Sequence, residues 1–303
     1  MRRLFFRILA LNLIVLACSF SGQAIAAKKA MLWELSKGDS TIYLFGSVHV
    51  WKKNLYPLYD SINNAYKRSD TLTVEVDLNS LRQKEVAELI RKKGVYPAGI
   101  SILDYLSIEQ TRTLENKLKK SNMSLASFQQ FKPWLLSTQV MQANLAKLGY
   151  LPKYGMDQHF LAKAKAENKP VGQLETLEQQ IAIIDSVYED LLKIDADLLV
   201  YEKSLDSGYL QLLMETWEMG HYESLYSLLV KETLTKYPQA RPALDKLFDI
   251  RNRKFVTEII TMLTNDGTHF VIIGAGHFGG NNGIVALLER KGYKLRQLDT
   301  TSH

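Results

Sequence analysis

The sequence predicts an α/β fold, in which a mixed sheet is built from both ends of the chain and a large helical insertion separates the two halves. Apolar patterns typical of strands occur between residues 31 and 78 and again between 269 and 298. The residues between these two regions are rich in Leu, Lys, Gln and Glu at helical spacing. We find no repeat, linker or low-complexity segment in residues 27–303, which we therefore expect to form a single domain.

The amino-terminal half of the sheet is predicted from two patterns. Residues 31–35 and 41–45 are expected to form a hairpin, because Gly38 lies in the short turn between them. Residues 71–78 alternate polar and apolar side chains, which is typical of a strand with one buried face. A helix over residues 56–67 connects these strands.

The middle of the chain is predicted to be helical and the end to return to strands. Residues 81–147 form several short helices, because Pro97 and Pro133 interrupt the pattern. The near-continuous apolar run at residues 269–273 is typical of a buried strand. The other expected elements are helices over residues 157–167, 176–236, 243–263 and 283–291, and strands over residues 169–174 and 293–298.

Residues 1–26 have the three parts of a secretory signal peptide. A basic start containing Arg2 and Arg3 is followed by an apolar run from Ile8 to Phe20 and by Ala24-Ile25-Ala26, a small-residue cleavage site. The run is shorter than the roughly 20 apolar residues that a membrane-spanning helix needs. We therefore predict cleavage after Ala26, a mature chain without a transmembrane anchor, and a periplasmic or secreted protein.

Charge and cysteine content exclude several classes of function. Removing residues 1–26 takes away three arginines and no acid, so the formal net charge falls from +6 to +3. No stripe of basic and aromatic residues remains, and we expect no nucleic-acid partner. The single cysteine, Cys18, lies in the predicted signal peptide. Disulfides, zinc-thiolate sites and cysteine nucleophiles are thus excluded from the mature chain.

Two histidines follow predicted strands at the same spacing. Gly46-Ser47-Val48-His49 comes directly after the strand ending at Phe45, and Gly274-Ala275-Gly276-His277 follows the strand ending at Ile273. In open α/β sheets, ligands bind beyond the carboxyl ends of strands, where glycine allows a sharp turn. Both imidazoles are candidates for such a site, although a core or surface histidine that is hydrogen-bonded to backbone is an equally good interpretation of each.

Glu75 is the third candidate, near the end of the strand predicted over residues 71–78. From the pattern alone, a polar strand face covered by water or a helix explains Glu75 better. In the functional interpretation, Glu75 joins His49 and His277 as the inner shell of a divalent metal or acts as a general base.

Eight segments in order along the chain resemble one known family. They are residues 32–35, 43–49, 55–58, 71–77, 154–160, 172–176, 251–253 and 274–277. The chain resembles the TraB/GumN family (TraB/PrgY/GumN), which is related to the Tiki metalloproteases. The resemblance covers nearly the whole chain after residue 27.

This resemblance implies a mixed α/β fold and a metal-dependent hydrolase, expected to be a peptidase, whose ligands and catalytic residues are His49, Glu75 and His277. The expected cofactor is a divalent ion of the manganese, cobalt or zinc type. A peptide or small-molecule substrate would then be attacked by metal-bound water, whose pKa falls from about 15.7 toward 7.

Four further residues are second-rank candidates. Asp157 and Glu175 are expected either to orient a ligating imidazole or to cap the helices that follow them. Arg251 and Arg253 are expected to bind a substrate carboxylate or a developing oxyanion, unless they are surface residues of a helix.

Two other functions remain open at this point. More distant relatives by fold include a haem-binding lipoprotein and esterases that open macrolide rings. A non-enzymatic haem- or peptide-binding envelope protein is therefore one alternative. A metal-free esterase that uses a histidine and a glutamate is the other.

Overall fold

The computed structural model describes residues 28–195, 198–200 and 206–301. The predicted signal peptide and its cleavage point after Ala26 lie outside the described residues. Among the residues described, no helix has both the length and the apolar character needed to cross a membrane.

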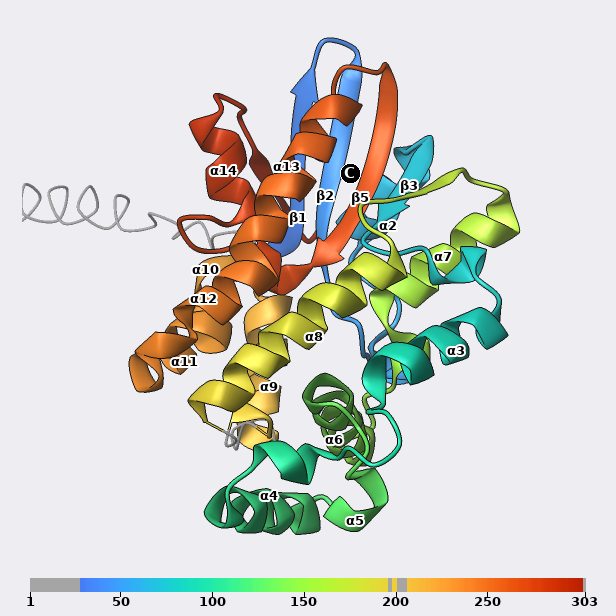
Figure 1. Ribbon diagram of the computed structural model, residues 1–303. Coiled ribbons are helices and arrows are strands. Elements are labelled where there is room, and N and C mark those ends of the chain that lie inside the picture. Colours follow the sequence, from blue (N-terminus) through green and yellow to red (C-terminus); the bar gives the residue numbers. More distant parts are fainter. Residues whose placement is uncertain (1–27, 196–197, 201–205, 302–303) are drawn as a thin grey trace, which may run out of the picture.

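A six-stranded mixed sheet has the order β4-β3-β5-β2-β1-β6 (Figure 1). Strands β2, β3, β4 and β5 are parallel, β1 pairs antiparallel with β2, and β6 pairs antiparallel with β1. Because β5 inserts between β2 and β3, the sheet is built from both ends of the chain, and the predicted fold class is confirmed. The strands are β1 (Lys29–Lys37), β2 (Ser40–Ser47), β3 (Thr71–Val74), β4 (Val171–Gln173), β5 (Gly267–Gly274) and β6 (Arg296–Asp299).

The predicted hairpin is present as β1 and β2. Its tight turn places Gly38 at φ +60°, a left-handed conformation that glycine adopts without steric cost. The predicted strand over residues 71–78 is shorter than expected, since β3 ends at Val74. Beyond it, the side chain of Asp77 accepts the N–H of Asn79 at 3.0 Å and starts a 3₁₀ turn. This departure from the sheet leaves Glu75 just past the carboxyl end of β3.

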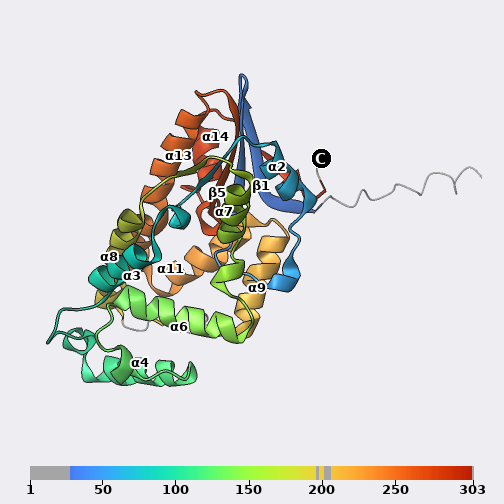
Figure 2. The same ribbon diagram turned by 90° about the vertical axis from the view of Figure 1, so that its right-hand side faces the viewer.

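The helices divide into those that cover the sheet and those that lie beyond its carboxyl edge. Helices α2 and α7 pack on one face and α13 and α14 on the other (Figures 1 and 2). The covering helices are α2 (Asp60–Arg68), α7 (Met156–Glu167), α13 (Arg251–Met262) and α14 (Ile284–Arg290). Helix α2 begins four residues later than predicted, after the Pro57 segment.

The insertion forms a helical layer below the strand ends (Figure 1). Its helices are α3 (Gln83–Gly94), α4 (Ile108–Lys120), α5 (Leu125–Phe128), α6 (Pro133–Lys147), α8 (Leu177–Ile194), α9 (Ser207–Glu218), α10 (Tyr222–Tyr226), α11 (Glu232–Lys236) and α12 (Arg241–Leu244). A π-helical segment, Asp245–Ile250, joins α12 to α13. Such segments occur frequently at functional sites.

An aromatic cluster at the sheet holds α2 and α7 in place. Phe45 of β2 and Phe270 of β5 lie with ring centroids 5.8 Å apart, and both rings contact Phe160 of α7. Tyr66 of α2 packs against Phe160 and Phe270. Burial of these large side chains is the main favourable term of folding, and it fixes the strand ends on which the candidate site is built.

Candidate functional site

Three neighbouring parallel strands bring the principal candidate residues together. β5 pairs with β2 on one side and with β3 on the other, and Ser47 of β2 lies opposite Gly274 of β5. The segments that follow these strands carry His49, Glu75 and His277. The crevice predicted beyond the carboxyl ends of the strands is where these side chains meet.

Gly274 marks the point at which the three side chains converge. A Cβ atom added to Gly274 would lie 3.2 Å from Glu75 Oε1, 3.3 Å from His49 Nε2 and 3.8 Å from His277 Cδ2. Because glycine lacks this atom, Glu75 Oε1 and His49 Nε2 can approach the backbone of Gly274 closely from two sides.

His49 is the accessible member of this cluster, with 63% of its side chain exposed. Its Nδ1 lies 2.9 Å from Asp157 Oδ2, and the hydroxyl of Ser47 donates to Asp157 Oδ1 at 3.1 Å. Asp157 of α7 therefore fixes the imidazole with a proton on Nδ1 and leaves Nε2 toward Gly274. The negative charge of Asp157 raises the pKa of His49 from 6.5 to about 9.

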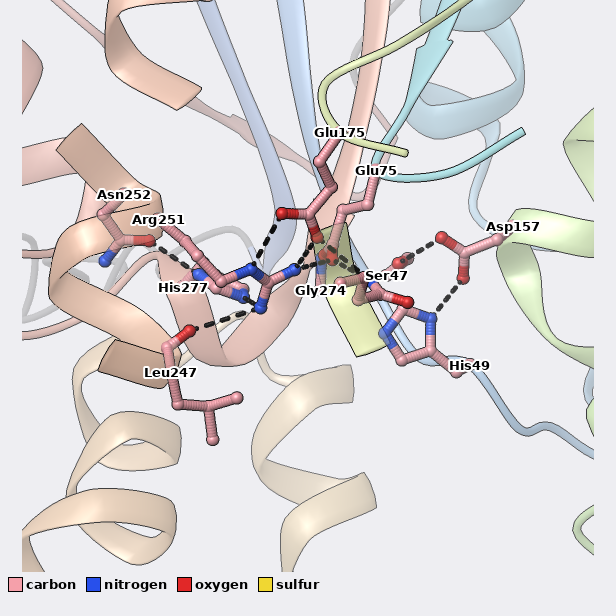
Figure 3. A network of polar contacts seen from close by, with 11 residues as sticks. Ser47, His49, Glu75, Asp157, Glu175, Leu247, Arg251, Asn252, Gly274 and His277 are labelled. Carbon is pink, nitrogen blue, oxygen red and sulfur yellow. Dashed lines mark hydrogen bonds and ion pairs between the residues drawn. The ribbon is translucent and has the colours of Figure 1, made fainter. Parts of the chain in front are cut away.

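Arg251 lies at the centre of a buried ion cluster (Figure 3). Its Nη2 donates to Glu75 Oε2 and to Glu175 Oε1, both at 2.5 Å, and its Nε donates to Glu175 Oε2 at 3.3 Å. Its Nη1 donates to the carbonyl of Leu247 at 3.2 Å and to His277 Nε2 at 3.0 Å. These contacts use all five N–H donors of the guanidinium.

The backbone explains why the two glutamates share one arginine. The N–H of Glu175 donates to the carbonyl of Glu75 at 3.0 Å, which continues the pairing of β3 with β4. Burial raises the pKa of Glu75, but the charges of Arg251 and protonated His49 and the N–H of Gly274 outweigh this effect and hold the pKa below its ordinary value. Glu75 is thus ionised although only 4% of it is exposed.

His277 is buried and neutral. Its Nδ1 lies 2.6 Å from Asn252 Oδ1, which can only accept, so this nitrogen carries the proton and Nε2 accepts from Arg251. Burial, with the nearby cation of Arg251, lowers the pKa of His277 to about 3. Asn252 is held in turn by its own donation to the carbonyl of Asn282 at 2.8 Å.

The second-rank candidates separate clearly. Asp157, Glu175 and Arg251 belong to the cluster, whereas Arg253 is exposed on α13 and makes no contact with it in the described structure. Arg251 has no free N–H with which to bind a substrate carboxylate or an oxyanion, because all five of its donors are used within the protein.

Sequence reasoning gave no role to Ser47, Gln180 or Asn252. Ser47 and Asn252 lie inside the Gly46–His49 and Arg251–Arg253 motifs, which is the indication that could have drawn attention to them. Gln180 donates to Glu75 Oε2 and to Glu175 Oε1, both at 3.2 Å. Gln180 lies one turn into α8, outside these motifs, and no sequence pattern indicates its role.

A cavity of about 500 Å³ opens from this polar cluster into the helical layer. Its polar end contains His49, Glu75, Arg251 and His277, and its walls are apolar side chains of the insertion. Wall residues include Met141 of α6, Ile184 of α8, and Leu213 and Trp217 of α9. Its size and lining are those of a small-molecule or substrate site.

The side chains do not fit the three-ligand metal shell that the resemblance implies. The structure, over the residues it describes, contains no group of three or more His, Cys, Asp or Glu side chains able to hold an ion. His277 Nε2 and Glu75 Oε2 are instead occupied by Arg251. A ligand needs a free lone pair directed at the ion, and His277 lacks one while Arg251 is bound to it.

The fold and the cluster define an α/β protein with a histidine-carboxylate site at the carboxyl ends of its parallel strands. The chain belongs to the TraB/PrgY/gumN family, whose model matches residues 31–297.

Similar curated proteins carry two kinds of name. Uncharacterized protein YbaP of Escherichia coli is 28% identical over 59% of this chain and 65% of its own length. Metalloprotease TIKI homolog of Amphimedon queenslandica is 23% identical over 91% of this chain and 63% of its own length, and Metalloprotease TIKI1 of Danio rerio is 22% identical over 88% and 62%. The chain thus spans less than two thirds of these relatives. No solved structure matches it significantly.

Proposed function

We propose that this protein is a hydrolase that cleaves a peptide or ester bond at the polar end of the cavity, with His49 as the general base. The observation that carries the proposal is the convergence of His49 Nε2 and Glu75 Oε1 on Gly274 at the polar end of the cavity. A water molecule that enters this end of the cavity would find one imidazole acceptor and one carboxylate acceptor close together. A general base must be within hydrogen-bond distance of the proton it removes.

The side chains then take the following roles. Neutral His49 accepts a proton from water while the water oxygen adds to the substrate carbonyl, and Asp157 stabilises the imidazolium that forms. The imidazolium returns this proton to the leaving amine or alkoxide. Glu75 orients the water, and Arg251 and His277 are positioning residues that hold Glu75 at the end of β3.

The names of the TIKI relatives point to a metal, and a divalent ion of the manganese, cobalt or zinc type is the cofactor expected from the family resemblance. Such an ion would supply hydroxide at neutral pH by lowering the pKa of its bound water. Coordination by His277 requires Arg251 to leave His277 Nε2, with loss of a buried hydrogen bond. We therefore assign the proton transfers to the side chains of this chain.

The test is hydrolysis of doubly capped peptides and of aryl esters by protein purified without a metal-affinity tag, with bound metal measured in the same sample. We expect turnover to survive a chelator, and Gly274→Ala to reduce it at least tenfold because its Cβ enters the space between His49 and Glu75. Turnover lost on chelation and restored by manganese, cobalt or zinc would replace the His49 mechanism with a metal mechanism. Absence of turnover in every condition would contradict a hydrolase.

We also propose that the hydrolase acts in the periplasm or outside the cell. This proposal is supported by the signal-peptide pattern of residues 1–26.

A further inference from the structure

The walls that the insertion contributes to the cavity are mostly apolar. Met141 of α6, Ile184 of α8 and Leu213 of α9 line it from separate helices, and Leu229 and Phe248 close it from two π-helical segments, Ser227–Lys231 and Asp245–Ile250. Among the lining residues that the structure describes, the charged side chains are Glu75, Arg251 and, when protonated, His49.

Each of these charges already has a partner within the protein. Arg251 directs all five donors to Glu75, Glu175, Leu247 and His277. Glu75 accepts from Arg251, from Gln180 and from the Gly274 N–H, which donates to Oε1 at 2.7 Å. Protonated His49 is paired with Asp157.

A charged group of the substrate would therefore meet a partner only in the Nε2 proton of protonated His49, and that proton is absent from the neutral form that acts as the base. Burial of an unpaired carboxylate or ammonium is costly, and a site made of paired charges and apolar walls selects against both. A free carboxylate beside the scissile bond has no guanidinium available to bind it. A free amine has no carboxylate that is not already held by Arg251.

We propose that the cavity selects an uncharged apolar group attached to the scissile carbonyl. Such a group is an alkyl acyl chain or a run of apolar side chains. Substrates with a free charged terminus at that position are excluded. The proposal rests on the proposed hydrolase function and adds its substrate class. It predicts an esterase or endopeptidase specificity and argues against carboxypeptidase or aminopeptidase activity.

Two exposed residues provide a matched pair of variants. Met141 lines the cavity and is 42% exposed, whereas Leu212 on α9 is 44% exposed and is not among the lining residues. Because both side chains are partly in water, Met141→Glu and Leu212→Glu should both fold. Only Met141→Glu places a carboxylate at the cavity wall. Leu213→Gln, at a buried lining position beside Leu212, serves as a second cavity variant.

The experiment measures kcat/KM for aryl esters with unbranched acyl chains of two to ten carbons. It also compares doubly capped apolar peptides with the same peptides carrying a free carboxylate or amine next to the scissile bond. We expect kcat/KM to rise about fourfold for each methylene that enters the cavity and to fall at least tenfold for either free terminus. The chain-length dependence should weaken in Met141→Glu and Leu213→Gln and persist in Leu212→Glu. A preference for long acyl esters would identify the apolar group as an acyl chain, and a preference for capped peptides would identify it as a run of apolar side chains.

A binding measurement separates this proposal from the proposed function. Trp217 lines the cavity, so an uncharged bromoalkyl amide bound there should quench tryptophan fluorescence, with weaker quenching in Met141→Glu than in Leu212→Glu. Saturable quenching without turnover of any substrate would support the apolar site and contradict the hydrolase. Turnover that is independent of chain length, or faster with a free terminus, would overturn the substrate class and leave the hydrolase standing. Absence of quenching, together with a kcat/KM that does not depend on chain length, would also overturn the proposed substrate class.

Discussion

Removal of the Arg251 guanidinium should destabilise the protein strongly. Arg251→Met keeps much of the length and apolar volume of the side chain but leaves Glu75 and Glu175, which are 4% and 3% exposed, without their cation. Breaking a buried ion pair by removing one partner costs about 3 to 5 kcal/mol, because the remaining charge is buried and uncompensated.

The pKa of Glu75 sets the pH dependence of this effect. Arg251 helps to hold this pKa below its ordinary 4.5, so the stability that the pairing contributes is complete above pH 4.5 and is lost as the pH falls below it. At pH 7 the loss expected for Arg251→Met is therefore the full cost of about 3 to 5 kcal/mol.

The assay is urea unfolding at pH 7, followed by tryptophan fluorescence, with Arg253→Met as the control. Arg253 is the same residue type on the same helix, but it is exposed, and its substitution should change the free energy of unfolding by less than about 0.5 kcal/mol. The difference between wild type and Arg251→Met should narrow at pH 4, where the uncompensated glutamates take up protons. Equal stability of the two variants at pH 7 would refute the central role of Arg251.

Two other predictions concern the pH dependence and the start of the mature chain. Because Asp157 raises the pKa of His49 to about 9 and the base must be neutral, kcat should increase with pH up to about 9. Asp157→Asn removes the charge that stabilises the imidazolium, so the midpoint of the pH profile of kcat should move toward 6.5 and its maximum should be lower. An unchanged pH profile would argue against His49 as the base. Amino-terminal sequencing of protein recovered from the periplasm or medium should begin at Ala27, whereas an intact Met1 would contradict the predicted cleavage.

The sequence was sufficient to predict the sheet and the placement of His49 and His277 at one edge of it. Strand alternation and apolar runs are local patterns, and the carboxyl ends of neighbouring parallel strands necessarily lie at one edge. Glu75 required the fold, because a solvated or helix-covered face explained its alternating strand better. Only the order β3-β5-β2 places Glu75 beside the two histidines.

Arg251 shows what the sequence leaves open. Helical spacing puts it on the face of α13 that also carries Phe255 and Ile259, which indicates burial of an arginine. Its partners Glu75 and Glu175 are 176 and 76 positions away along the chain. No local pattern predicts that the five N–H donors of Arg251 are satisfied within the protein. These hydrogen bonds occupy His277 Nε2 and Glu75 Oε2, and for this reason the side chains do not fit the three-ligand metal shell.

The cavity was also beyond local prediction. Its walls come from α6, α8, α9 and the π-helical segments, each of which has an amphipathic or apolar sequence that suits a closed core equally well. Whether such faces close on one another or leave a space depends on how the helices are oriented in the folded chain.

The most direct test of the hydrolase account is kcat/KM for His49→Gln measured beside His221→Gln. His49 lines the polar end of the cavity beside Gly274, whereas His221 is an exposed residue at the start of α10 and lies outside the cavity lining. Loss of the general base should lower kcat/KM by about 10² to 10⁴ in His49→Gln, with wild-type stability and with no effect in His221→Gln. A His49→Gln protein that keeps more than a tenth of the wild-type rate would contradict the account.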